Sequence, residues 1–239
     1  MALACFAALG NAQEGGDLQA QILYAFHTED TNQLTNLVQT LSTQVKSGGA
    51  DPALRYHLAH AQYRFGLLAG ERRPRDAEAA LGDCVDQLKQ VLEQDAKSAE
   101  ALALQSACYA NLAKYKRLEA SMLRSRADDR LREAYAIAPR NPRVLCLSAM
   151  DGLARSKPGS QENQRAFAQL QLAAQLFDQS SATRIDVPGW GHAEAYLALG
   201  MQLRSRGDLL GARNWIEKSL IVAPDFKAAQ RQLANLVGH

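Results

Sequence analysis

The sequence has few aromatic residues and lacks the segments on which β-sheet and membrane-spanning proteins depend. Aromatic residues make up 6% of the 239 residues, and there is no extended run of Val, Ile and Thr. No stretch reaches the ~20 consecutive apolar residues that cross a bilayer. Hydrophobic residues still account for 47% of the chain, and Ala, Leu and Gln are abundant. This composition predicts an all-α protein with a buried core and no transmembrane segment.

The motifs that mark common enzyme classes are missing as well. No P-loop, G-x-G-x-x-G, H-E-x-x-H, G-x-S-x-G or C-x-x-C pattern occurs. His57 and His60 are three residues apart on an expected helix, but two histidines without a third ligand make a weak metal site. We expect both to be surface or groove histidines. The sequence therefore predicts no catalytic residue, no metal site and no cofactor.

The chain also lacks a strong charge of one sign, since its net charge is +2. Residues 114–143 carry nine basic and four acidic residues, a local charge of +5 that would attract an anionic surface or nucleic acid. Residues 124–133 nevertheless mix both signs at close spacing, as a solvated helix face does. No aromatic residue for base stacking stands between Tyr115 and Tyr135. We therefore expect no nucleic acid partner.

Basic residues are absent from the start of the chain, where Lys46 is the first Lys or Arg. Residues 2–9 are apolar, and Gly10-Asn11-Ala12 resembles the small-residue cleavage site of a signal peptide. A signal peptide should also carry a positively charged beginning, which this sequence does not have. We interpret residues 1–16 as the remnant of a signal peptide or as a disordered N-terminus. The first interpretation predicts an exported, periplasmic protein, and the second a cytoplasmic one.

Cysteine is scarce, with four residues in the chain. Cys5 would be removed with a signal peptide, leaving Cys84, Cys108 and Cys146 inside expected helices. An odd number of cysteines in an exported protein leaves at least one free thiol. We expect all three to be small core residues at helix contacts.

The most regular part of the chain is residues 193–226, a 34-residue unit of two expected helices around a turn. Its apolar and small residues at helical spacing are Tyr196, Leu199, Gly200 and Leu203 on the first helix, and Ala212, Ile216 and Ser219 on the second. Gly200 lets the second helix approach closely, and Ala212 is the small residue that faces it. Asp208 is expected to cap the second helix, and Pro224 to end it. A single hairpin of this kind needs neighbours to bury its apolar face.

This unit resembles the tetratricopeptide (TPR) repeat, whose period is 34 residues. Other stretches resemble it less closely, including EAYAIAPRNP at 133–142. The resemblance implies an all-α right-handed superhelix of antiparallel helix pairs with a C-terminal capping helix. We expect a divergent N-terminal hairpin at 17–50 and TPR-like repeats over 51–239. The repeats are expected at about 51–96, 97–139, 140–188 and 189–226, followed by the capping helix at 227–238.

Two short stretches also resemble a family of exported bacterial TPR proteins without assigned activity. They are Asn141-Pro142-Arg143-Val144 and Pro188-Gly189-Trp190-Gly191. The glycine-rich run that often follows the first stretch in that family is replaced here by Lys157-Pro158-Gly159-Ser160. We expect Trp190 to pack under the preceding loop, as a tryptophan at the start of a helix usually does.

The TPR resemblance implies a concave groove lined by the first helix of each repeat, which binds a peptide or partner protein. The groove candidates are Glu100, Ala103, Ala107, Arg143, Cys146, Met150, Glu194, Leu197, Met201 and Arg204. TPR domains that hold a C-terminal carboxylate carry Lys and Asn at such places, whereas this chain has Leu, Met and Ala. The resemblance thus predicts a non-catalytic interaction module for an apolar or mixed peptide. The alternative is a small-ligand carrier whose pocket is lined by Met150, Met201 and tyrosines.

Overall fold

The computed structural model describes residues 17–47, 51–181 and 190–237. The expected signal-peptide remnant at 1–16 and Pro188-Gly189 lie outside the described residues. Within the described ranges the chain is all-α, without strands. It divides into two compact units, Met1–Ala96 and Lys97–His239, called here the first and the second unit. No helix in the described part is both long and apolar enough to cross a membrane.

The first unit is a set of consecutive helices around one small apolar core. Residues 17–27 are helical, and they are followed by α2 (Thr31–Ser47), α3 (Pro52–Ala69), the short 3-10 helix η1 (Gly70–Arg72) and α4 (Pro74–Gln94). Asp51 caps α3 by accepting a hydrogen bond from the backbone N–H of Ala53 at 2.9 Å. The α3 and α4 helices approach each other closely at Gly66, which has no Cβ. A Cβ there would lie only 2.8 Å from Cγ of Leu81.

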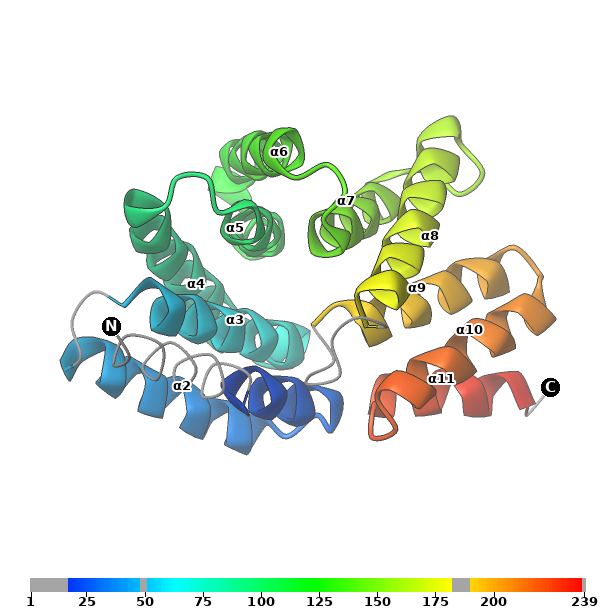
Figure 1. Cartoon of the computed structure of the whole chain (residues 1–239), viewed down its shortest axis with the longest axis horizontal. Helices are drawn as coiled ribbons and strands as arrows, with labels where there is room; N and C mark the ends of the chain where they lie inside the picture. Colours follow the sequence, from blue (N-terminus) through cyan, green and yellow to red (C-terminus); the bar gives the residue numbers. More distant parts are fainter. Residues whose placement is uncertain (1–16, 48–50, 182–189, 238–239) are drawn as a thin grey trace, which may run out of the picture. The chain divides into compact units, whose positions relative to one another are not determined.

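The second unit consists of three successive helix pairs and a final helix, which Figure 1 shows in green to red. The pairs are α5 (Ala99–Leu112) with α6 (Ala120–Ile137), α7 (Pro142–Arg155) with α8 (Gln161–Ser181), and α9 (His192–Ser205) with α10 (Leu209–Val222). A short 3-10 helix, η2 (Arg117–Glu119), precedes α6, and α11 (Lys227–Val237) packs against α10. The two helices of each pair follow one another in the chain and pack against each other.

The α9–α10 pair is closed by the close contact expected from the sequence. A Cβ on Gly200 would lie 2.6 Å from Cγ1 of Ile216 and 2.9 Å from the carbonyl oxygen of Ala212. No real Cβ tolerates such distances, so only glycine fits at this position. The hydroxyl of Ser219 adds a buried hydrogen bond to the carbonyl of Ala193 at 2.8 Å. Gly200 and Ala212 therefore have the roles that the repeat pattern predicted.

The other two pairs of the second unit close by related contacts with different residues. In α5–α6 the Ser106 hydroxyl donates to the carbonyl of Ala127 at 2.8 Å, and both residues are buried. In α7–α8 a Cβ on Gly152 would lie 3.0 Å from the Cβ of Ala166. A small residue on the first helix thus faces an alanine on the second in both pairs, which brings the two backbones together.

The ends of the helices follow the expected capping signals. Asp208 accepts a hydrogen bond from Gly211 N–H at 2.8 Å at the start of α10, and Gly207 in the preceding turn has φ +83°. Ala223, before Pro224, leaves the helical region with φ −138° and ψ 86°. Asn141 caps α7 through the backbone N–H groups of Arg143 and Val144.

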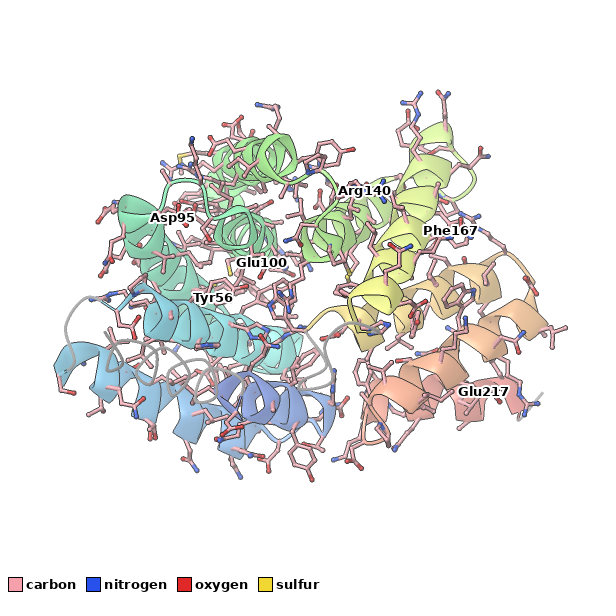
Figure 2. The ribbon with its side chains drawn as sticks, viewed as in Figure 1. Tyr56, Asp95, Glu100, Arg140, Phe167 and Glu217 are labelled. Atoms are coloured by element: carbon pink, nitrogen blue, oxygen red, sulfur yellow. The ribbon has the colours of Figure 1, made fainter. Side chains whose placement is uncertain are left out.

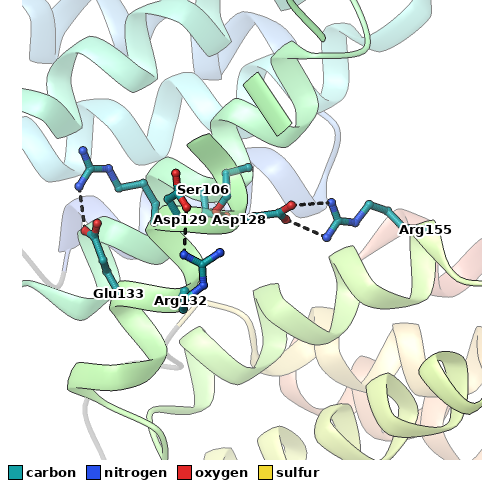
Figure 3. A network of polar contacts seen from close by, with 8 residues as sticks. Ser106, Asp128, Asp129, Arg132, Glu133 and Arg155 are labelled. Atoms are coloured by element: carbon teal, nitrogen blue, oxygen red, sulfur yellow. Dashed lines mark hydrogen bonds and ion pairs between the residues drawn. The ribbon is translucent and has the colours of Figure 1, made fainter. Parts of the chain in front are cut away.

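The α6 and α7 helices are joined at their surface by an ion pair. Both terminal nitrogens of the Arg155 guanidinium donate to Asp128, at 2.8 and 3.4 Å (Figure 3). Arg155 Nε also lies 3.1 Å from the Asp151 carboxylate. On α6 itself, Arg132 pairs with Asp129 and Arg130 with Glu133, each three residues apart. The mixed charges of this basic stretch therefore pair within one helix face, as the spacing predicted.

The cysteines are core residues, but two of them have a further role that the sequence did not indicate. Cys84 on α4 and Cys108 on α5 are fully buried and disulfide-bonded. Cys146 on α7 is buried and keeps its thiol. Spacing along the chain gave no hint of the disulfide bonding, because neither residue belongs to a C-x-x-C pair.

Candidate functional site

The ten groove candidates lie on the first helices of the three pairs in the second unit. They recur at equivalent positions along α5, α7 and α9 and so form three rows, each with one residue per helix. The first row is Glu100, Arg143 and Glu194; the middle row is Ala103, Cys146 and Leu197; the last row is Ala107, Met150 and Met201. Arg204 follows the last row on α9. The three rows differ sharply in their exposure and in their contacts.

The first row contains an ion pair between neighbouring helices. Arg143 Nη1 on α7 lies 2.8 Å from both carboxylate oxygens of Glu100 on α5. Glu100 is labelled in Figure 2. The Asn141 side chain donates to the same carboxylate at 3.0 Å. The side chains of Arg143 and Glu100 are 22% and 30% exposed, so water screens the pair only partly. Sequence reasoning placed both residues in the groove but did not predict that they neutralise each other.

Arg143 also joins this ion pair to the start of α9. Its Nε donates to the backbone carbonyl of Trp190 at 3.3 Å, and its guanidinium carbon lies 5.4 Å from the Trp190 ring centroid. Trp190 itself is buried. The ring is therefore a core residue, and its contact with Arg143 is a cation–π interaction. The loop under which it was expected to pack lies outside the described residues.

Glu194, the third member of the first row, caps its own helix. Its Oε2 accepts a hydrogen bond from the backbone N–H of Gly191 at 3.0 Å, which pairs one backbone donor at the start of α9. Gly191 has φ +97°, and a Cβ there would lie 2.9 Å from Cζ of Phe177. Glu194 is buried, and its carboxylate caps α9.

The middle row is part of the core. Ala103, Cys146 and Leu197 are all buried. The Cys146 thiol donates to the backbone carbonyl of Gly191 at 3.8 Å, which is a second link between α7 and the start of α9. These residues therefore fix the spacing of the first helices and offer no surface to a ligand.

The last row is the exposed part of the candidate site. Met150 is 39% exposed and Met201 is 41% exposed, while Ala107 is half-buried. Arg204, beyond Met201, donates to the side chain of Gln232 on α11. The surface available to a partner therefore consists of methionines, and the nearby arginine is held by the final helix.

A polar and aromatic cluster that sequence reasoning missed joins α8, α9 and α10. The hydroxyl of Tyr196 donates to Asp178, whose Oδ1 is also 3.1 Å from Nε2 of His192. The His192 ring stacks on Phe177 with centroids 5.3 Å apart. The Tyr196 ring lies 5.3 Å from that of Trp215. Helical spacing correctly placed Tyr196 in the core, but no sequence signal paired it with a residue eighteen positions earlier.

Burial shifts the pKa values of two residues in this cluster, His192 and Tyr196. Burial lowers the pKa of His192, and the nearby Asp178 and Glu194 oppose this shift. Burial and the contact with Asp178 both raise the pKa of Tyr196, which therefore stays protonated at neutral pH. A neutral imidazole and a protonated phenol can share the single Asp178 carboxylate without like-charge repulsion. The cluster thus joins the C-terminal part of α8 to the start of α9.

The two histidines of α3 lie deeper than expected. His60 is fully buried, and Arg64 Nε donates to its Nε2 at 3.0 Å, so the expectation of a surface or groove histidine was wrong for His60. His57 is half-buried, and desolvation lowers its pKa. Among the described residues, no group of three potential ligands gathers around a common point that would hold a metal ion.

Comparison with known proteins identifies the architecture. No family model matches the sequence, and no curated protein matches it. Among solved structures, the fold is similar to the crystal structure of a thermophilic TPR protein from Thermus thermophilus. The TM-score is 0.66 and the sequence identity 19%, over 95% of this chain and 99% of that chain. The chain has a TPR-like fold. At this identity the likeness establishes the TPR-like fold alone and assigns no partner.

Proposed function

We propose that this TPR-like protein is a non-catalytic interaction module that binds a peptide or partner protein through Met150 and Met201. The observation that carries the proposal is the contrast within the predicted groove. The middle row is buried, whereas the two methionines of the last row are about two-fifths exposed. Methionine has a flexible, polarisable side chain that adapts to varied apolar surfaces, and it recurs where proteins bind several partners.

The charges around this row support an apolar segment as the partner. The Arg143 guanidinium is engaged by Glu100, and Arg204 by Gln232. Binding a peptide carboxylate at either arginine would require breaking the existing contact. An apolar segment needs no such exchange, because its affinity comes from the methionine surface that it buries.

The proposal is tested by placing a photo-crosslinking amino acid, p-benzoylphenylalanine, at position 150 or 201 of the full chain. The control carries it at Ile221, which is 79% exposed on α10. Irradiation in an extract of the source organism should give the same crosslinked protein from positions 150 and 201 and none from 221. Crosslinks equally frequent at all three positions, or absent at 150 and 201, would refute the assignment.

Substitution provides a second measurement once a partner has been identified. Met150→Asp and Met201→Asp should each weaken its binding at least about tenfold, because a charge would be desolvated in the interface. Ile221→Asp should leave binding unchanged. Leu197 is not suitable for this test, because it is buried and a charge there would disturb folding.

We also propose that the protein works in an oxidising compartment such as the periplasm, with the cytoplasm as the alternative. Support comes from the buried, disulfide-bonded Cys84 and Cys108, because stable disulfides are rare in the reducing cytosol. Acid quenching of cells followed by alkylation and mass spectrometry tests this. Cys84 and Cys108 should be alkylated only after reduction. Their alkylation in the quenched, unreduced protein would contradict the proposal.

A further inference from the structure

The first unit contains a polar cavity whose lining includes none of the residues discussed as a partner surface. Its volume is about 520 Å³, within the range of small-molecule sites. It lies among α2, α3 and α4, where α3 packs against both of the other helices (Figure 1). The lining residues are Ser42, Val45, Lys46, Arg55, Leu58, Gln62, Asp83 and Gln87. Only Val45 and Leu58 among them are apolar.

Two of the lining side chains carry buried polar atoms that have no hydrogen-bond partner. Gln62 is 4% exposed, and its Oε1 accepts no hydrogen bond. The Nε of Arg55 is likewise buried and donates to no acceptor. Buried polar atoms are nearly always paired in folded proteins, because leaving one unpaired is unfavourable. Two on the same helix, both lining one cavity, indicate a ligand that supplies the missing groups.

The geometry of Arg55 indicates the chemistry of one of those groups. Its Nη1 donates to the Gln87 side chain at 3.1 Å, so one end of the guanidinium is already fixed. The edge formed by Nε and Nη2 remains, and two parallel N–H groups of this kind match the two oxygens of a carboxylate. Lys46 on α2 adds a second positive charge to the cavity wall.

The other lining groups require a donor from the ligand. Gln62 Oε1 can only accept, so an N–H or O–H group must approach it. Asp83 on α4 is an acidic group of the same wall, and burial together with Asp86 raises its pKa. A ligand ammonium would favour the ionised form of this carboxyl. The cavity thus combines a site for a carboxylate with acceptors for an amine.

We propose that this cavity binds a small α-amino carboxylate, namely a free amino acid. The carboxylate pairs with Arg55 and Lys46, the amino group donates to Gln62 and Asp83, and an apolar side chain contacts Val45 and Leu58. This site is in the first unit and is independent of the interaction surface proposed for the second.

The first test is thermal unfolding of the full chain with each of the twenty common L-amino acids at millimolar concentration. A ligand that binds only the folded state raises the unfolding temperature. We expect at least one amino acid with an aliphatic side chain to do so. For L-leucine, the matched probes are L-leucinamide, which lacks the carboxylate, and 4-methylpentanoic acid, which lacks the amine; both should bind at least about tenfold more weakly. No stabilisation by any of the twenty amino acids would overturn the proposal.

Variants distinguish this cavity from any other site on the chain. Arg55→Met and Gln62→Leu should each weaken the binding measured by calorimetry at least about tenfold, because each removes one recognised group. Arg75→Met is the control, since Arg75 is exposed on α4 outside the lining. Circular dichroism of the unliganded variants checks that they fold. Equal affinity of the folded Arg55→Met and wild-type proteins would exclude the cavity as the site. Binding of L-leucine, L-leucinamide and 4-methylpentanoic acid with equal affinity would exclude the proposed recognition.

Discussion

Arg143 on α7 donates from a single nitrogen to both carboxylate oxygens of Glu100 on α5, at 2.8 Å each. The same guanidinium donates to the Trp190 carbonyl at 3.3 Å. One partly buried arginine therefore connects the starts of three successive first helices. Its side chain could have been a cation for a ligand, but these contacts make it a structural link.

We expect Arg143→Met to lower the free energy of unfolding by about 1–3 kcal/mol, because the half-buried Glu100 carboxylate and the carbonyl of the buried Trp190 would lose a charged donor. Glu100→Gln should cost less, since an amide oxygen still accepts one hydrogen bond. Urea denaturation measures both. The matched control is Arg213→Met, which breaks the pair with Glu217 whose side chains are 57% and 41% exposed and should change stability little. Equal effects of Arg143→Met and Arg213→Met would contradict the assignment.

The close contact at Gly200 predicts a destabilising effect from one added methyl group. Gly200→Ala should lower stability by about 1–3 kcal/mol, because the new Cβ meets Ile216 and the backbone oxygen of Ala212. Gly82→Ala is the control, since Gly82 is inside α4 and a Cβ there meets nothing within 4 Å. That substitution should stabilise by about 0.5–1 kcal/mol, through the helix preference of alanine. Thermal unfolding of the two variants must shift in opposite directions.

The lowered pKa of His192 predicts a loss of stability in mild acid. Burial places its folded-state pKa below the ordinary value of 6.5. The unfolded chain therefore binds the proton more readily, and stability falls as the pH drops through about 6.5. The urea midpoint should be lower at pH 5 than at pH 7.5, and the difference should shrink in His192→Gln.

NMR titration of the His192 ring measures the same shift directly. We expect a pKa below 6.5 in the wild type. Asp178→Asn should lower this pKa further, because Asp178 is one of the groups that raise it. A wild-type value at or above 6.5, or an increase on Asp178→Asn, would show that desolvation does not dominate.

Disulfide bonding at Cys84 and Cys108 predicts a protein whose stability depends on redox conditions. Dithiothreitol should lower the thermal midpoint of the wild type, because a disulfide typically contributes about 2–4 kcal/mol. The double variant Cys84→Ala with Cys108→Ala should be less stable and should not respond to the reductant. Cys146→Ala should respond as the wild type does, since Cys146 keeps its thiol. A wild type indifferent to the reductant would contradict the prediction.

The sequence predicted what depends on local chemistry. Gly200 facing Ala212, the Asp208 cap and the stop before Pro224 all follow from residues close together in the chain, and the structure confirms each. Burial of Tyr196 followed from helical periodicity in the same way. These features could be predicted because a helix pair is a short segment whose sequence pattern repeats.

What the sequence did not predict depends on pairings across the fold. Arg143 and Glu100 are 43 positions apart, and periodicity alone assigned both to an open surface. His60 was expected to be accessible, but it is fully buried and accepts a hydrogen bond from Arg64. Spacing along one helix does not reveal either fact. The cavity beside Arg55 and Gln62 draws its lining from three helices, so no motif in a single stretch marks it.

The hydroxyl contacts of Ser106 and Ser219 span 21 and 26 positions, so the α5–α6 and α9–α10 pairs are each joined by residues of consecutive helices. Closing such short segments costs little chain entropy, and each pair gains its contacts without waiting for distant regions to meet. Evolution or a protein engineer can therefore lengthen or shorten the second unit by whole helix pairs. Loss of one helix alone would leave a small-residue stripe, such as that around Gly200, facing water.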